Sequence, residues 1–342
     1  MPAGDAHARQ DREELRLVKT AKLGPFTVSR VGLGCMNLSH AYSAPPPREE
    51  SIALLNRALD LGCTHLDTAA LYGFGANETL VGEAVSHRRK DFTLASKCAM
   101  TGVDGKRVID GRPETILRTC DEALKRLRTD VIDLYYLHRW DKKVPIEESM
   151  GAMAALAAAG KIRAIGLSEV SAATLRKAHA VHPVAAVQSE YSLWTRNPEI
   201  ALLDVCRELG VAFVAFSPLG RGFLAGAVRD AKQFTPGDIR LFMPRFQEEN
   251  FPANVALLSD LRVLSAETGR PMSQLALAWT IAKGTLPIPG TTRIDHMEEN
   301  LATDAFDLDA AMLARIEAAF DPKAVRGPRY NPATQAEIDT EG

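Results

Sequence analysis

Residues 131–168, VIDLYYLHRWDKKVPIEESMGAMAALAAAGKIRAIGLS, contain the unit that decides the fold. The unit begins with a short, largely apolar run, Val131–Leu137, and ends with another, Ile162–Ser168. Between them, Ile146–Ala159 has the length and composition of a helix, and Gly160 follows where helices commonly end. Largely apolar strands are typical of a parallel sheet covered by helices. The unit therefore predicts a strand, a helix and a second, parallel strand.

The same alternation continues on both sides of this unit. The other predicted strands are Val31–Gly34, Thr64–Asp67, Thr93–Lys97, Val184–Glu190, Val211–Phe216 and Leu286–Pro289. The other predicted helices are Glu49–Leu61, Glu78–Val85, Pro113–Leu127, Ala172–His179, Ile200–Leu209 and Ala253–Thr268. Eight strands alternating with helices predict an α/β fold, a (β/α)8 TIM barrel. A doubly wound open sheet shows a similar alternation along the chain and is the alternative.

Two segments fall outside the eightfold pattern. Leu15–Arg30 alternates around Gly24-Pro25, which predicts an N-terminal β-hairpin that covers the amino-terminal mouth of the barrel. The connection from Ser217 to Asn250 is rich in Gly, Pro and Arg and is long for a compact domain. We expect it to be a functional loop, and a candidate lid, at the carboxyl-terminal face.

The pattern predicts one barrel domain, residues 15–324, between a polar N-terminal tail, residues 1–14, and a C-terminal tail, residues 325–342. The last helix is expected at Asp309–Phe320. The C-terminal tail is polar and contains two prolines, and we expect partial ordering, with Arg326–Tyr330 in contact with the barrel.

Length and composition bound the function. The 342 residues are 46% hydrophobic and 25% charged, as in an ordinary globular enzyme. The net charge of −2 argues against a dedicated nucleic-acid partner. The longest apolar run, Met150–Ala159, is far shorter than the ~18 residues of a membrane span, and the N-terminus lacks the apolar core of a signal peptide. We therefore expect a cytoplasmic protein without a membrane partner.

The cysteines agree with this location. They are odd in number, widely spaced and form no CxxC pair, so a disulfide framework or a zinc site is not expected. Reduced thiols are predicted at Cys35, Cys63, Cys98, Cys120 and Cys206.

Reactive side chains follow three consecutive predicted strands. In TIM barrels the chemistry lies at the carboxyl ends of the strands. The second strand ends in Asp67 with Tyr72 just beyond, the third ends in Lys97, and the fourth is followed by His138. Each has an ordinary explanation when taken alone: a helix cap, a loop aromatic, a lysine that reaches solvent, or a hydrogen-bonded core histidine. Together they match one reaction.

That reaction is carbonyl reduction. A hydride that arrives at carbon leaves negative charge on oxygen, so an acid must protonate it. The Tyr72 phenol, with a pKa of about 10, carries a proton at neutral pH. An ammonium such as Lys97 would bring this pKa closer to the working pH, and Asp67 would hold the ammonium in place. His138 would orient the carbonyl oxygen and stabilise its charge. No metal is needed.

At these residues the chain resembles the aldo-keto reductases. The resemblance is carried by RVGLGCMNLS, HLDTAALYGFGANETLVGEAV, LASK, DLYYLHR, IGLSEVS, VQSEYSLW, FSPLGRGFLAG and PIPGTTRIDHMEEN. These stretches run from about residue 17 to residue 320 in the order and spacing of the family. The chain is most similar to bacterial NADPH-dependent reductases of the group that includes pyridoxal reductases, and more distantly to potassium-channel β-subunits.

The resemblance implies a barrel that binds NADPH without a Rossmann domain, with Asp67, Tyr72, Lys97 and His138 as the catalytic tetrad. It implies that Ser168 and Gln188, with Glu169 beside them, hold the nicotinamide amide while Tyr191 stacks on the ring. The implied pyrophosphate site is formed by Ser217, Leu219, Gly220 and Gly222, with Arg221 as an ion-pair partner. The implied 2′-phosphate and adenine site is formed by Gly290, Thr291, Arg293, Glu299 and Asn300.

One departure from the family concerns the cofactor. Many members carry a lysine at the position of Gly290 and an arginine at that of His296. Arg293 supplies a planar fork that matches phosphate from a nearby position. We expect NADPH/NADP+ to be preferred, with NADH as a weaker alternative.

The substrate partner is expected to be a small carbonyl compound. Its wall is predicted to include Met36, Asn37, Tyr42, Trp140, Trp194 and parts of Phe242–Phe251. This mixture of side chains suits a benzaldehyde, pyridoxal or a bulky cyclic ketone, so the sequence does not select one substrate. The sequence does not indicate the oligomeric state.

Two other functions are compatible with the pattern, and a third lacks the residues that it needs. The tetrad works in reverse as an alcohol dehydrogenase. A regulatory module would bind NADP(H) with little turnover. A barrel hydrolase or isomerase would need paired carboxylates or a histidine cluster at the strand ends, which the sequence lacks.

Overall fold

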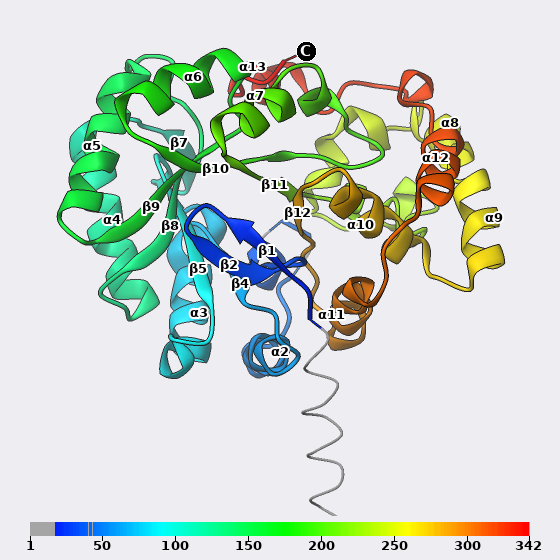
Figure 1. Ribbon diagram of the computed structural model, residues 1–342, viewed down its shortest axis with the longest axis horizontal. Coiled ribbons are helices and arrows are strands. Elements are labelled where there is room, and N and C mark those ends of the chain that lie inside the picture. Colours follow the sequence, from blue (N-terminus) through cyan, green and yellow to red (C-terminus); the bar gives the residue numbers. More distant parts are fainter. Residues whose placement is uncertain (1–17, 40, 43, 342) are drawn as a thin grey trace, which may run out of the picture.

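The computed structural model describes residues 18–39, 41–42 and 44–341, in which the strands form a barrel (Figure 1). Its eight parallel strands, neighbours in chain order, are β3 (Leu33–Gly34), β4 (His65–Asp67), β5 (Thr93–Cys98), β8 (Ile132–Leu137), β9 (Ile162–Ser168), β10 (Val184–Glu190), β11 (Ala212–Phe216) and β12 (Leu286–Ile288). Backbone hydrogen bonds join the first strand to the last, from Gly32 N to Pro287 O (2.9 Å) and from Gly34 N to Pro289 O (3.2 Å). The barrel prediction is confirmed, and the open-sheet alternative is wrong.

Helices surround the barrel. They are α2 (Arg48–Asp60), α3 (Ala76–Val85), α4 (Pro113–Leu127), α5 (Ile146–Ala158), α6 (Ala172–Val181), α7 (Leu202–Leu209), α8 (Phe251–Ala256), α9 (Ser259–Thr268), α10 (Met272–Ala282), α11 (Ile294–Leu301), α12 (Ala310–Ala319) and α13 (Pro332–Ala336). The single helix predicted at Ala253–Thr268 is wrong, because α8 and α9 divide it. The chain makes two tight turns there, which place Leu258 in the core.

Helices α10, α11 and α13 and a second hairpin were not predicted. Helix α10 is buried along nearly its whole length, from Met272 to Thr280, so its sequence shows no one-sided apolar stripe. A second hairpin, β6 (Met100–Val103) and β7 (Lys106–Ile109), follows β5. Its turn is Asp104-Gly105, both with positive φ, and Asp-Gly is a hairpin signal that the sequence does carry.

The predicted N-terminal hairpin is present as β1 (Thr20–Leu23) and β2 (Phe26–Ser29), joined by Gly24-Pro25. Gly24 has φ +56°, and a Cβ atom there would lie 2.6 Å from the Cβ of Ala185, so the turn needs glycine. Leu23 and Val28 are buried among the interior side chains of the barrel. The hairpin therefore covers the amino-terminal mouth, where Ser29 N donates to Thr64 Oγ1 at 2.8 Å.

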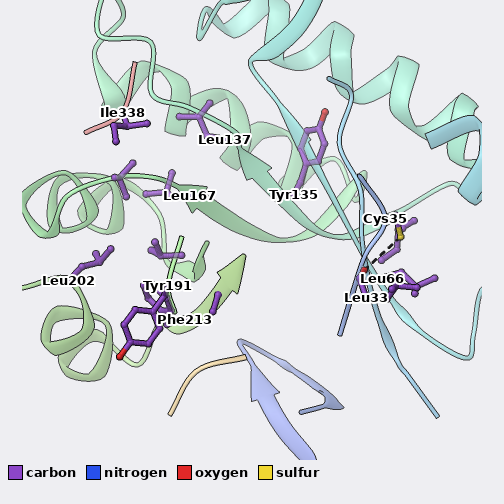
Figure 2. Close-up of a cluster of buried hydrophobic side chains, with 14 of the residues drawn as sticks. Leu33, Cys35, Leu66, Tyr135, Leu137, Leu167, Tyr191, Leu202, Phe213 and Ile338 are labelled. Carbon is purple, nitrogen blue, oxygen red and sulfur yellow. Dashed lines mark hydrogen bonds between the residues drawn. The ribbon is translucent and has the colours of Figure 1, made fainter. Parts of the chain in front are cut away.

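Alternation along the strands divides the core into two shells. On β8, Tyr135 belongs to the shell between strands and helices, and Tyr136 belongs to the interior of the barrel. Figure 2 shows part of the outer shell, where Tyr135 and Leu137 lie among residues of neighbouring strands. Because every second residue faces inward, Asp67 and Lys97 can meet at the top of the interior.

The C-terminal segment, residues 325–341, packs against the barrel. Its contacts include the predicted stretch Arg326–Tyr330 and continue beyond it. Arg329 forms a buried ion pair with Glu169. Beyond it, Asp339 accepts hydrogen bonds from Ser171 N and from Thr174 Oγ1. This segment, red in Figure 1, thus packs against the residues that follow β9 and against the start of α6.

Two further expectations concern the chemistry of the chain. All five cysteines are buried as free thiols, as predicted. In the part of the chain that the structure describes, no helix is long and apolar enough to cross a membrane. The predicted polar tail, residues 1–14, lies outside the described residues.

A buried histidine predicts acid sensitivity. His65 on β4 is fully buried, and both of its ring nitrogens lack a partner in the described structure. Burial lowers its pKa from 6.5 to about 4. The unfolded chain therefore binds this proton first, and stability is lost as the pH falls from about 6.5 towards 4. We expect the His65 contribution to fall by about 3 kcal/mol between pH 7 and pH 4.

The test compares wild type with His65→Phe, which cannot titrate, by urea unfolding at pH 7 and pH 4. The wild type should lose about 3 kcal/mol more than the variant over this interval. Equal losses of unfolding free energy in the wild type and in His65→Phe would contradict the assignment of this acid sensitivity to His65.

Candidate active site

A cavity of about 1020 Å³ opens at the carboxyl ends of the barrel strands. Its walls come from the strand ends, from the long connection after β11 and from the C-terminal segment. Asp67, Tyr72 and His138 line it, and Lys97 lies directly behind Tyr72. The four residues that follow three separate strands in the sequence are thus brought together.

Lys97 is the centre of this group. Its ammonium is fully buried and donates to an Asp67 carboxylate oxygen, to Thr68 O at 2.8 Å and to the Tyr72 hydroxyl at 3.1 Å. The other Asp67 oxygen accepts from Gln188 Nε2 at 2.7 Å. Burial alone would lower the Lys97 pKa, but Asp67 and Tyr72 outweigh it and raise the pKa. The ammonium therefore stays charged at neutral pH.

Tyr72 is held by the loop that follows it. Gly73, Phe74 and Gly75 all have positive φ, which turns the chain sharply between β4 and α3. A Cβ at Gly75 would lie 2.9 Å from Arg126, whose Nε donates to Glu78 Oε2 at 2.7 Å. Glycine at this position allows the arginine to support the loop.

The Tyr72 hydroxyl differs from expectation in one respect. Burial raises its pKa above the ordinary value, and the nearby Lys97 opposes this shift without cancelling it. The lowered pKa that the sequence predicts is therefore not found. The phenol is therefore protonated at neutral pH, and its oxygen lies beside the Lys97 ammonium.

His138 lies edge-on to Tyr72, with ring centroids 5.8 Å apart. Burial, together with the charges of Lys97 and Arg139, lowers its pKa well below the ordinary value. The imidazole is therefore neutral at pH 7, and one ring nitrogen carries a proton that it can donate to an oxygen in the cavity.

Most of the predicted cofactor residues also line the cavity. They are Ser168, Gln188, Ser217, Leu219, Arg221, Gly222, Gly290, Thr291, Arg293, Glu299 and Asn300. Ser217 and Gly222 have positive φ, so the backbone after β11 is irregular where the cavity passes it. Gly290 approaches its neighbours closely: a Cβ there would lie 2.7 Å from Asn37 Oδ1 and 2.9 Å from Gly34 O.

Arg221 is already paired. It forms an ion pair with Glu190 at 2.9 Å and hydrogen bonds with the hydroxyls of Tyr330 at 3.1 Å and Tyr42 at 3.3 Å. Its side chain is only 7% exposed. The guanidinium therefore ties the long connection to the C-terminal segment, and its pairing gives no support for the expected contact with pyrophosphate.

Two cofactor predictions need correction. Tyr191 does not line the cavity: its ring packs against Phe213 and Trp279, and its hydroxyl donates to Glu199 at 2.7 Å. It follows Gln188 by three positions, an odd number, so it faces the helices. Gly220 also lies away from the cavity, because it faces Trp194.

The substrate wall is partly as predicted. Met36, Asn37, Tyr42 and Phe242 line the cavity. The predictions for Trp140 and Trp194 are wrong. Trp140 packs on the outer core, with its Nε1 bonded to Val144 O at 2.9 Å, and Trp194 is buried against Phe223, with ring centroids 4.0 Å apart. Both rings contribute to packing.

Several residues of the cavity were missed, and four of them bear on the site. Phe216 is the last residue of β11, and Arg139 directly follows His138, so the strand-end rule covers both. Arg107 lies on the unpredicted hairpin, and Tyr330 comes from the C-terminal segment. The sequence carries the turn signal of that hairpin and predicts contact between Arg326–Tyr330 and the barrel, but only tertiary packing brings these two side chains to the cavity.

Comparison with known proteins identifies the family. The model of the aldo/keto reductase family matches residues 30–321. The chain belongs to the aldo/keto reductase family. It is 43% identical over 330 residues, 94% of this chain and 97% of the relative, to the aldo-keto reductase yakc [NADP(+)] of Schizosaccharomyces pombe. This aldo-keto reductase is therefore an oxidoreductase.

Solved structures show the same barrel. The glycerol dehydrogenase AKR11B4 of Gluconobacter oxydans has a TM-score of 0.80 and 27% identity, covering 92% of this chain and 98% of its own. An aldo/keto reductase of Klebsiella pneumoniae, in complex with NADP and acetate, has a TM-score of 0.70 and 29% identity, covering 92% and 99%.

Proposed function

We propose that this enzyme reduces an aldehyde or a ketone to the alcohol by hydride transfer from NADPH, with Tyr72 as the general acid. The observation that carries the proposal is the hydrogen-bonded chain from Tyr72 through Lys97 to Asp67, which reaches the cavity beside a neutral His138. A phenol, a cation and a neutral imidazole at one point match the needs of a carbonyl oxygen that becomes negatively charged.

Each residue has a separate task. The Tyr72 hydroxyl gives its proton to the carbonyl oxygen as charge develops there. Lys97, hydrogen-bonded to the same phenol oxygen, stabilises the phenolate that remains, and Asp67 holds the ammonium in position. His138 donates a hydrogen bond to the carbonyl oxygen, which orients it towards Tyr72. Burial of the group strengthens these interactions.

The residues present fit NADPH. The cavity extends from Tyr72 to Arg293 and Asn300, a length of wall that a small carbonyl compound alone would not occupy. Ser168 and Gln188 would hold the nicotinamide amide, the backbone at Ser217–Gly222 the pyrophosphate, and Thr291 with Arg293 the 2′-phosphate. When bound, NADPH supplies the hydride for the carbonyl carbon. The names of the S. pombe relative and of the K. pneumoniae complex, which both include NADP, support the phosphorylated cofactor.

The test is the loss of NADPH absorbance with a panel of aldehydes and ketones, with NADH in parallel. We expect carbonyl-dependent oxidation of NADPH, and slower oxidation of NADH because Arg293 has no phosphate to bind. Tight NADPH binding with negligible turnover would favour a regulatory module. Failure to bind either nucleotide would contradict the proposal.

A further inference from the structure

The arginines that line the cavity differ in how their charge is balanced. In the described ranges they are Arg107, Arg139, Arg221, Arg240 and Arg293. Four form ion pairs with a carboxylate: Arg107 with Glu337, Arg221 with Glu190, Arg240 with Asp238 and Arg293 with Asp295. The Arg293 pair is 63% and 61% exposed, so a phosphate can compete with Asp295 for Arg293. Arg139 has no carboxylate partner among the described residues. Its charge is therefore available to a ligand.

The contacts of Arg139 leave most of its donors free. Its Nη1 donates to His138 O at 2.8 Å and to Ser168 Oγ at 3.3 Å, both neutral acceptors. A guanidinium has five N–H donors in a planar fork. No protein acceptor is found for its Nε and Nη2 groups in residues 18–39, 41–42 and 44–341, and the side chain lines the cavity. A planar acceptor with two oxygens would satisfy them.

Arg139 lies beside the reacting groups. Burial is the main cause of both shifts, which raise the pKa of Tyr72 and lower that of His138; the charge of Arg139 opposes the first and adds to the second, as does Arg107 at His138. Neither carboxylate that lines the cavity pairs with Arg139: Asp67 is paired with Lys97, and Glu299 accepts from Ser273 near the predicted adenine end. Arg139 is therefore a cation near Tyr72 without a paired carboxylate in the described residues.

We propose that Arg139 binds a carboxylate of the substrate, so that the preferred carbonyl compounds are oxo acids or aldehydes that carry a carboxylate. This inference rests on the proposed function. One unbalanced charge matches a monoanion, and a guanidinium binds a carboxylate through two parallel hydrogen bonds. A neutral substrate would leave the cation in the cavity without a counter-charge.

The test uses two substrates of similar shape, 4-carboxybenzaldehyde and its neutral methyl ester. In the wild type we expect kcat/KM to be at least about tenfold higher for the acid. Arg139→Met should lower the acid-to-ester ratio by about 10- to 100-fold, as expected for a charge-assisted hydrogen bond. Arg139→Lys should restore part of the ratio. The matched control is Arg207→Met on α7, an exposed arginine far along the chain from the site, which should leave both values as in the wild type.

A binding measurement separates this proposal from the proposed function. Calorimetry gives the dissociation constant of benzoate for the enzyme with NADP+, which we expect to rise about 10- to 100-fold in Arg139→Met. If Arg139→Met lowered kcat/KM equally for the acid and the ester and also weakened NADPH binding, the proposal would be overturned and Arg139 would be assigned to the cofactor. A wild-type preference for the ester would overturn it as well. If the wild type reduced no carbonyl compound, the proposed function would fail, and unchanged benzoate binding in the variant would still overturn the carboxylate site.

Discussion

Tyr72→Phe is expected to lower kcat for aldehyde reduction by about 10²- to 10⁴-fold, the range for loss of a general acid. The change removes one oxygen atom and keeps the ring that lies edge-on to His138. Lys97 loses one acceptor but keeps Asp67 and Thr68 O, so the ammonium remains in place. The fold should therefore be intact, and the loss should fall on the chemical step. Single-turnover oxidation of NADPH measures that step directly.

Tyr135→Phe is the matched control. Tyr135 is also fully buried, but it faces the helices, and its hydroxyl has no hydrogen-bond partner in the described structure. Removal of that hydroxyl should leave kcat within about twofold of the wild type. A similar rate for both variants would mean that another group protonates the carbonyl oxygen.

Arg329→Met is expected to lower the free energy of unfolding by about 3–5 kcal/mol, the usual cost of breaking a buried ion pair from one side. The side chains of Arg329 and Glu169 are 7% and 0% exposed. Without the guanidinium, the Glu169 carboxylate keeps the Glu190 N–H at 2.8 Å but has no counter-charge beside it. Urea unfolding at pH 7 measures the loss. Because Arg329 anchors residues 325–341, limited proteolysis should also cleave this segment faster.

Arg315→Met on α12 provides the control for this ion pair. Arg315 pairs with Glu267, and both side chains are 49% exposed, so water replaces the lost contact. Loss of the Arg315–Glu267 pair should lower the free energy of unfolding by less than about 1 kcal/mol. The double variant Glu169→Gln/Arg329→Met should recover part of the loss, because no buried charge remains unpaired. If Arg329→Met cost no more than Arg315→Met, the C-terminal segment would be held by other contacts.

The sequence predicted the barrel and the reactive group for the same reason. Apolar strands of a parallel sheet stand out as short continuous runs, and the residue that ends each run lies at the same face of the barrel. Asp67, Lys97 and His138 follow directly from this rule. The family resemblance assigned ring stacking to Tyr191, and here the alternation of the strand corrects it. Tyr191 lies three positions after Gln188, so its side chain faces the helices, and Phe216 lies at the cavity instead.

Tertiary structure alone decided how charges pair around the cavity. Nothing in the sequence indicates that Arg221 pairs with Glu190, that Arg329 pairs with Glu169 across 160 positions, or that Arg139 has no carboxylate partner in the part of the chain that the structure describes. The local pattern specifies which face of a strand a side chain occupies, because that depends on backbone geometry over two residues. Pairing over long distances depends on the packing of segments far apart in the chain. The same packing buries Tyr72 and raises its pKa, whereas the sequence led us to expect that Lys97 would lower it.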